Sequence, residues 1–254
     1  MYYPIDRSAL KKRAKELLRE GKVSPIKMSV LLYAVVFVLS AALIAVSYAT
    51  AVSRSGPGLI LFFSILIYLA NLVLSQGYTI FCLGIWKGEK MPYGSLFDGF
   101  SFAGKIIGLT LVMALFVWLW SLLFIIPGII AMYRYSFALY NLCENPGLGI
   151  MEALEMSKQQ TQGYKMELFL LQLSFFGWAL LASLPQTFAE MAVANNDPGG
   201  PSIVIALVLL LASMIGQVFL QPYMQLSYAG FYLQATAANA NEEDPVSPPP
   251  PPEF

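Results

Sequence analysis

Apolar residues fill most of this chain in six long runs, which short polar or Gly/Pro-containing segments separate. One helix needs about 20 apolar residues to cross a bilayer. Five runs are near or above that length, whereas the run over 128–143 would make a helix of only about 24 Å. The pattern therefore predicts an all-α, polytopic membrane helix bundle with six transmembrane helices, over residues 28–52, 59–85, 104–126, 128–143, 166–188 and 202–220.

The segments that flank these runs are polar on one face. Residues 1–27 predict a basic, amphipathic helix that Asp6 caps and that ends near Glu20. Its cations suit the surface of anionic lipids, at about 1 kcal/mol per nearby charge, although a solvated tether would carry the same pattern. A second amphipathic helix is expected between Gly149 and Gln162. A juxtamembrane helix over 222–238 is expected to begin with Pro222 in its first turn, and the acidic, Pro-rich residues 239–254 predict a disordered tail.

Composition supports a membrane protein and narrows its chemistry. The chain is 57% hydrophobic and 12% charged, whereas soluble domains carry about 25% charged residues. It contains no histidine, and its two cysteines, Cys82 and Cys143, lie far apart. We therefore expect no metal site, no cofactor, no catalytic residue and no enzymatic activity. The formal net charge of zero gives no reason to expect a nucleic-acid partner.

The distribution of cations predicts the orientation. With six crossings, nearly all cations outside the spans fall on one side and Arg54 alone falls on the other. Positive charge accumulates in cytoplasmic loops, so both termini are expected in the cytoplasm and the protein in the inner (cytoplasmic) cell membrane. The cations on the expected cytoplasmic side are Arg7, Lys11, Lys12, Arg13, Lys15, Arg19, Lys22, Lys27, Lys87, Lys90, Lys105, Lys158 and Lys165.

A set of short phrases in the second half of the chain is similar to a known family. They are Ile126-Pro127-Gly128-Ile129, Tyr135-Ser136, Glu152-Ala153-Leu154 with Ser157, Gly163-Tyr164-Lys165, Leu173 to Trp178, Pro222-Tyr223 and Ala229 to Tyr232. In this order and spacing they resemble the bacterial integral membrane proteins grouped as domain of unknown function 975. The stretch from Leu10 to Gly21 and the Gly99-Phe100 region also look similar, so the likeness covers about residues 6–234. The resemblance implies a multi-span bundle with cytoplasmic amphipathic segments. It brings no established activity, substrate or catalytic residue.

Arg134 is the sharpest candidate for a functional residue, because it is a permanent cation within the fourth predicted span. Such a charge costs about 2.5–3.5 kcal/mol at a helix centre and usually faces the bundle interior. Its expected partners on the same half of the membrane are Gln186 and Glu190. The helix break before it is predicted at Pro127 and Gly128, because proline removes a donor and glycine tolerates turns. Arg134 is expected to be a structural anchor or to form an anion or ligand site.

The polar stretch between the fourth and fifth spans is the second candidate. The expected cytoplasmic interaction segment consists of Glu152, Glu155, Ser157, Lys158 and Lys165.

The sequence is compatible with two classes of function. The first is a non-catalytic scaffold or accessory component that supports transport or envelope homeostasis, with a membrane-protein partner or a second copy of itself. The alternative is a small transporter or channel for a lipid-like or amphipathic compound, centred on the Pro127 break and Arg134.

Overall fold

The computed structural model describes residues 5–20, 24–52, 58–194 and 201–243, and the regular structure in these ranges is entirely helical, as predicted. The elements are α1 (Arg7–Glu20), α2 (Pro25–Val52), α3 (Gly58–Trp86), η1 (Tyr93–Phe102), α4 (Ala103–Leu123), α5 (Ile125–Arg134), α6 (Ala138–Glu144), α7 (Ile150–Gln160), α8 (Lys165–Ala194) and α9 (Pro201–Glu243). The last part of the predicted tail, residues 244–254, lies outside the described residues, and its beginning is helical because α9 extends to Glu243.

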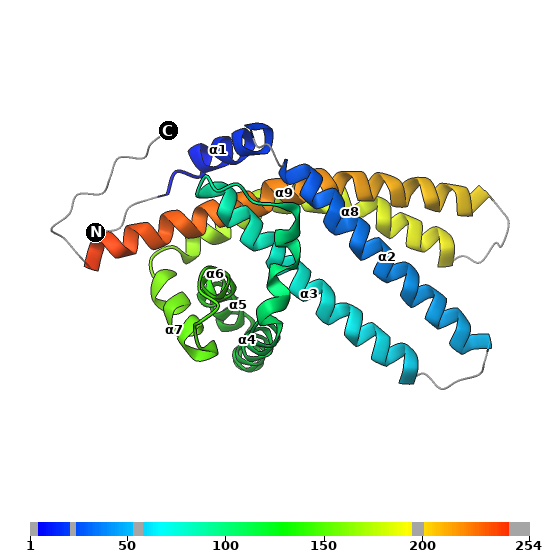
Figure 1. Ribbon diagram of the computed structural model, residues 1–254, viewed down its shortest axis with the longest axis horizontal. Helices are drawn as coiled ribbons and strands as arrows, with labels where there is room; N and C mark the ends of the chain where they lie inside the picture. The colour runs from blue at the N-terminus through cyan, green and yellow to red at the C-terminus, as the bar shows by residue number, and fades with distance from the viewer. Residues whose placement is uncertain (1–4, 21–23, 53–57, 195–200, 244–254) are drawn as a thin grey trace.

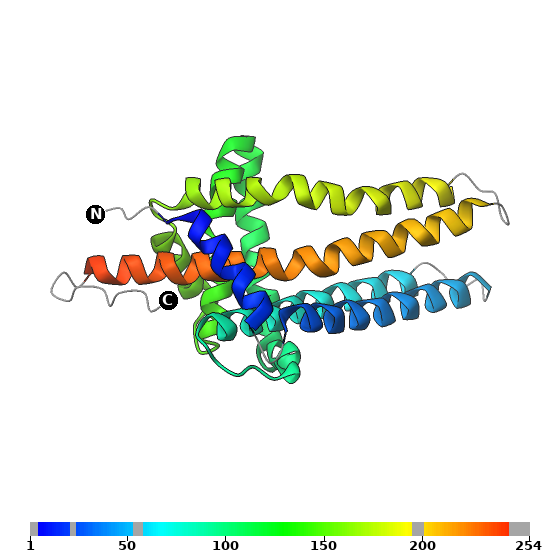
Figure 2. The ribbon, with the colours of Figure 1, turned by 90° about the horizontal axis from the view of Figure 1, so that it is seen from above.

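Four long helices run side by side along the longest axis of the molecule: α2, α3, α8 and the first half of α9 (Figures 1 and 2). At the end remote from α1, their apolar side chains point outward instead of into a core. We call this surface the apolar belt, and its exposed members include Phe37, Val38, Phe62, Tyr68, Trp178, Leu181, Val208, Leu211, Ile215 and Phe219. An apolar surface of this extent marks contact with lipid or protein.

Helix α9 belongs to two environments. Its 43 residues give a length of roughly 64 Å, about twice the hydrocarbon thickness of a bilayer. The side chains of Val208, Leu211 and Phe219 are exposed, whereas Leu226 and Phe231 are fully buried. The first half of α9 is therefore part of the apolar belt, and the second half is packed inside the protein.

Pro222 lies within this continuous helix and does not begin a new one. The prediction of a separate helix over 222–238 is corrected in this respect. Proline removes one backbone hydrogen bond and normally interrupts a helix. Here the neighbouring turns are held by tertiary contacts, because Tyr223 stacks edge-on against Phe175 of α8 and Gln225 donates to Thr79 of α3.

The second half of α9 organises a compact region that we call the helical body, consisting of α1, the second half of α3, η1, α6, α7 and α9 from residue 222 onward. Its core contains large, fully buried side chains from distant parts of the sequence, including Leu10, Phe81, Leu96, Phe137 and Phe231. Helix α1 begins as predicted, because Asp6 Oδ1 accepts hydrogen bonds from the backbone N–H groups of Ser8 and Ala9 at 2.8 and 3.2 Å.

Helices α4 and α5 form a hairpin that crosses the other long helices. Figure 1 shows α4 close to end-on, and Figure 2 shows the same hairpin running across α8 and α9. The tip of the hairpin is apolar and exposed: Leu122, Leu123, Phe124, Ile125 and Ile126 are each between 64% and 77% exposed. The hairpin thus presents a second apolar surface, which is separate from the belt.

The predicted fourth span, residues 128–143, is not one helix. Helix α5 ends at Arg134, a turn follows, and α6 begins at Ala138. By length and composition, four stretches of the described residues qualify as membrane spans: Pro25–Leu43, Gly58–Trp86, Tyr93–Leu123 and Lys165–Ala189. The prediction of six spans is therefore not confirmed, although several apolar helices of spanning length are present.

Candidate functional site

The break between α4 and α5 lies at Phe124, which is extended (φ −162°, ψ 153°). The sequence prediction placed it three residues later, at Pro127 and Gly128. Proline has no N–H to bond the carbonyl of Leu123, four residues earlier, and its ring would clash with that group. The helix must therefore be interrupted between Leu123 and Pro127, and Pro127 then occupies the first turn of α5, where the missing donor is tolerated.

Arg134 is the last residue of α5. Its backbone carbonyl therefore has no N–H group from a following helical turn to accept a hydrogen bond from. Two hydroxyl groups of the α7 region replace the missing donors. Ser157 Oγ donates to Arg134 O at 2.9 Å, and Thr161 Oγ1 donates to the same oxygen at 3.3 Å. Ser157 Oγ also accepts the backbone N–H of Phe137 at 3.1 Å. The turn between α5 and α6 is thereby fixed to α7.

The side chain of Arg134 lines a small cavity of about 190 Å³ together with Trp120, Pro127, Ile130, Ala131 and Lys165. Arg134 Nε is buried and has no hydrogen-bond partner among the described residues. The cavity therefore combines two cations with an apolar wall. A buried donor without a partner is costly unless a ligand or solvent satisfies it.

The predicted partners of Arg134 lie elsewhere. Gln186 is 21 residues beyond Lys165 on the same helix, which corresponds to roughly 30 Å at the helix rise. Gln186 Oε1 instead accepts a hydrogen bond from Gln217 of α9 at 3.5 Å, and the side chain of Glu190 lies outside the described residues. The structure therefore does not bring Arg134 and Gln186 together. The polar residue that lines the cavity beside Arg134 is Lys165.

The residues of the predicted interaction segment have different roles in the structure. Glu152 Oε2 accepts the backbone N–H of Gly149 at 3.1 Å and so caps α7. Lys158 pairs with Glu155 at 2.9 Å on the exposed face. Ser157 is fully buried. Within the segment, Glu155 and Lys158 remain as an exposed charged pair.

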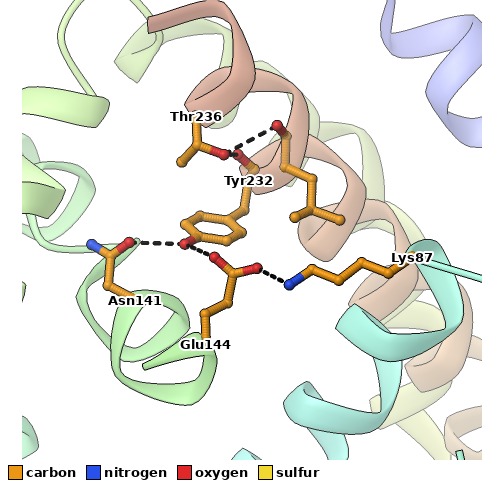
Figure 3. Close-up of polar contacts among 6 residues, drawn as sticks. Lys87, Asn141, Glu144, Tyr232 and Thr236 are labelled. Atoms are coloured by element: carbon orange, nitrogen blue, oxygen red, sulfur yellow. Dashed lines mark hydrogen bonds and ion pairs between the residues drawn. The ribbon is translucent and has the colours of Figure 1, made fainter. Parts of the chain in front are cut away.

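A polar network that the sequence did not predict joins three elements of the helical body (Figure 3). The hydroxyl of Tyr232 on α9 lies 2.6 Å from Glu144 Oε2 and 2.9 Å from Asn141 Oδ1, both on α6. Glu144 Oε1 forms an ion pair with Lys87 Nζ, just after α3, at 2.5 Å. The ion pair and the phenol together fix the end of α6 between α3 and α9. The only signal in the sequence was indirect: Tyr232 belongs to one of the phrases that carry the family resemblance.

Tyr232→Phe is expected to lower the free energy of unfolding by about 1–3 kcal/mol, because Glu144 and Asn141 lose a buried donor. Burial, and next the carboxylate of Glu144, raise the pKa of Tyr232 above its ordinary value of 10.0. The folded protein thus keeps a proton that the unfolded chain releases near pH 10, so stability declines as the pH rises above about 10. Unfolding followed by tryptophan fluorescence in detergent should show a shallower alkaline decline in the variant. Equal slopes would contradict this assignment.

The described residues form an all-helical protein that has several helices long and apolar enough to cross a membrane. Residues 122–239, which include most of the lining of the Arg134 cavity and the second half of α9, match the family described as "Protein of unknown function (DUF975)". The family resemblance seen in the sequence is confirmed over these residues. No curated protein and no solved structure matches the chain.

Proposed function

We propose that this protein is a non-catalytic membrane scaffold or accessory component. In this proposal α2, α3, α8 and the first half of α9 cross the membrane, and they hold the helical body at the cytoplasmic surface. The observation that carries the proposal is the difference between the two halves of α9: apolar side chains such as Val208, Leu211 and Phe219 are exposed in the first half, whereas Leu226, Phe231 and Tyr232 are buried in the second half. A protein with this shape presents an ordered surface next to the membrane, as a partner-binding component requires.

We infer the orientation from the cations of the helical body. Lys12, Lys15 and Arg19 belong to α1, Lys158 belongs to α7, and Lys90 lies between α3 and η1; positive charge favours the cytoplasmic side of a membrane. Because transmembrane helices tilt by about 0–40° from the membrane normal, the transverse α4–α5 hairpin does not cross alongside the other four. We propose that it lies along the cytoplasmic surface of the bilayer, with its apolar tip in the lipid interface.

Labelling of single introduced cysteines tests this topology. Gly58→Cys marks the far end of α3, Ile126→Cys the tip of the hairpin, and Glu155→Cys the helical body. In intact cells, an impermeant maleimide should label the first variant only, and it should label Glu155→Cys after permeabilisation. The native chain is the control, because its two cysteines are buried. Labelling of Ile126→Cys from outside would instead support six crossings.

Cross-linking in cells, followed by purification in mild detergent, tests the scaffold function. A stoichiometric protein partner that cross-links through Glu155→Cys, and not through Gly58→Cys, would support it. A stoichiometric small molecule without any protein partner would contradict it.

A specific observation favours the second candidate, a transporter or channel for a lipid-like or amphipathic compound. Pro127 and Arg134, on which that hypothesis was centred, do line one cavity. Loss of a bound small molecule in Arg134→Gln, with all protein partners retained, would favour transport over scaffolding.

A further inference from the structure

A groove runs along the outer surface between α8 and α9, with a volume of about 510 Å³. Trp178, Leu181 and Ala182 of α8 form one wall, and Gly216 and Phe219 of α9 form the other. The two small residues let the helices approach closely, since a Cβ placed on Gly216 would lie 3.4 Å from Cβ of Ala182. Trp178 and Phe219 are 64% and 58% exposed, so the groove belongs to the apolar belt.

One end of this groove carries positive charge from α1. Lys15 lines the groove, and its ammonium lies 5.5 Å from the centre of the Tyr223 ring. One helical turn earlier, Lys11 donates to Ser174 Oγ at 2.5 Å and lies 4.6 Å from the centre of the Phe175 ring. Figure 2 shows α1 crossing over α9 at the place where the belt gives way to the helical body. Both cations are therefore held at the boundary of the belt.

The described residues supply no carboxylate that forms an ion pair with the two cations at this boundary. Among the described residues, no carboxylate pairs with Lys15, whereas the neighbouring Arg13 pairs with Glu16 at 3.2 Å. Partial burial, followed by the cations Arg7 and Lys15, lowers the pKa of Lys11 from its ordinary value. An anion bound between Lys11 and Lys15 would relieve this repulsion.

We propose that the groove binds an anionic phospholipid, with one acyl chain along Trp178, Leu181 and Phe219 and the phosphate at Lys15 and Lys11. The arrangement matches the two parts of such a lipid, because an apolar channel within the belt ends at cations at the level of the headgroups. A neutral lipid would fill the channel and leave the cations unmatched. The inference goes beyond the proposed scaffold function, because it does not depend on a protein partner.

The test is native mass spectrometry of the full chain in detergent, titrated with phosphatidylglycerol or with phosphatidylcholine. The native protein should retain phosphatidylglycerol in preference. Lys15→Ala should weaken that binding about fivefold, which corresponds to about 1 kcal/mol per cation near an anionic lipid. Lys12→Ala is the matched control, because it removes the same charge from an exposed position of α1 that does not line the groove, and it should leave the binding unchanged.

A second variant tests the apolar part of the site. Ala182→Phe fills the groove and should reduce retention of both lipids, with a thermal melt confirming that the variant is folded. If it does not fold, Lys15→Ala still decides the proposal through the headgroup. Equal losses in Lys15→Ala and Lys12→Ala, or equal retention of the two lipids, would show only diffuse surface charge and overturn the proposal. Displacement by millimolar inorganic phosphate would overturn it too, because the site would then bind a free anion without a chain.

Discussion

Gly77→Ala is expected to lower the free energy of unfolding by about 3 kcal/mol or more, because among the glycines of the described residues Gly77 is the one that another segment approaches most closely. Gly77 lies in α3 where the backbone of η1 passes against it. A Cβ at this position would lie 1.9 Å from the carbonyl oxygen of Leu96 and 2.5 Å from its carbonyl carbon. Extra atoms in a packed core cost about 1–3 kcal/mol and sometimes more. Because the obstacle is backbone, no rotamer change relieves the overlap.

The same substitution at two other glycines separates crowding from helix propensity. A Cβ on Gly84, two turns further along α3, would meet only the flexible side chain of Met91, so Gly84→Ala should cost clearly less than Gly77→Ala. A Cβ on Gly177 of α8 meets nothing within 4 Å, and alanine in an open helical position should stabilise by roughly 0.5–1 kcal/mol. Thermal unfolding in detergent measures all three variants. A native-like melt of Gly77→Ala would show that α3 and η1 are not in this close contact.

The hydrophobic pattern predicted the helices well and their directions poorly. The belt helices α2, α3 and α8 and the helix α4 are all largely apolar and lack a continuous polar face, so nothing in the periodicity of α4 indicates that it runs across the bundle. Its direction is set by contacts of α3, η1 and α7 with its first half, including buried Ile106 and Leu109. Hydropathy measures composition along the chain, whereas direction depends on packing between segments far apart in the sequence.

Proline was informative at one position and misleading at another. Pro127 does indicate a helix break. The break lies three residues before the proline, at Phe124, because the proline ring clashes with the carbonyl four residues earlier. Pro222 lies inside a continuous α9, where Phe175, Thr79 and α1 hold the adjacent turns. A local signal of this kind gives the possibility of a helix break, and tertiary contacts decide whether it occurs.

The charged residues of α7 lie on its outside, whereas its buried face makes the contacts that hold the site together. The buried positions Ala153, Leu154 and Ser157 follow the three-to-four residue spacing of a helix face. The structure places Ser157 on the same packed face as Leu154, whereas the sequence prediction assigned it to the cytoplasmic interaction segment. A small polar residue in such a stripe indicates a hydrogen bond to buried backbone, and this signal was available in the sequence.

Ser157→Ala is accordingly expected to destabilise the protein by about 2 kcal/mol, within the 1–3 kcal/mol that one unpaired buried polar group costs. The fully buried hydroxyl accepts the N–H of Phe137 and donates to the carbonyl of Arg134. Thr161 still reaches that carbonyl at 3.3 Å, so Phe137 N–H is the group left without a partner. Hydrogen exchange should therefore accelerate first at the turn between α5 and α6, next to the Arg134 cavity.

The adjacent residue provides the control. Lys158→Ala breaks only the exposed pair with Glu155, whose side chains are 35% and 56% accessible, and such pairs contribute about 0–1 kcal/mol. It should leave exchange at Phe137 unchanged and shift the melt little. If the amide of Phe137 exchanged at the same rate in Ser157→Ala and Lys158→Ala, the hydroxyl of Ser157 would not be the group that fixes the turn after Arg134. If both variants lost stability equally, the charged face of α7, and not its buried serine, would hold the turn in place.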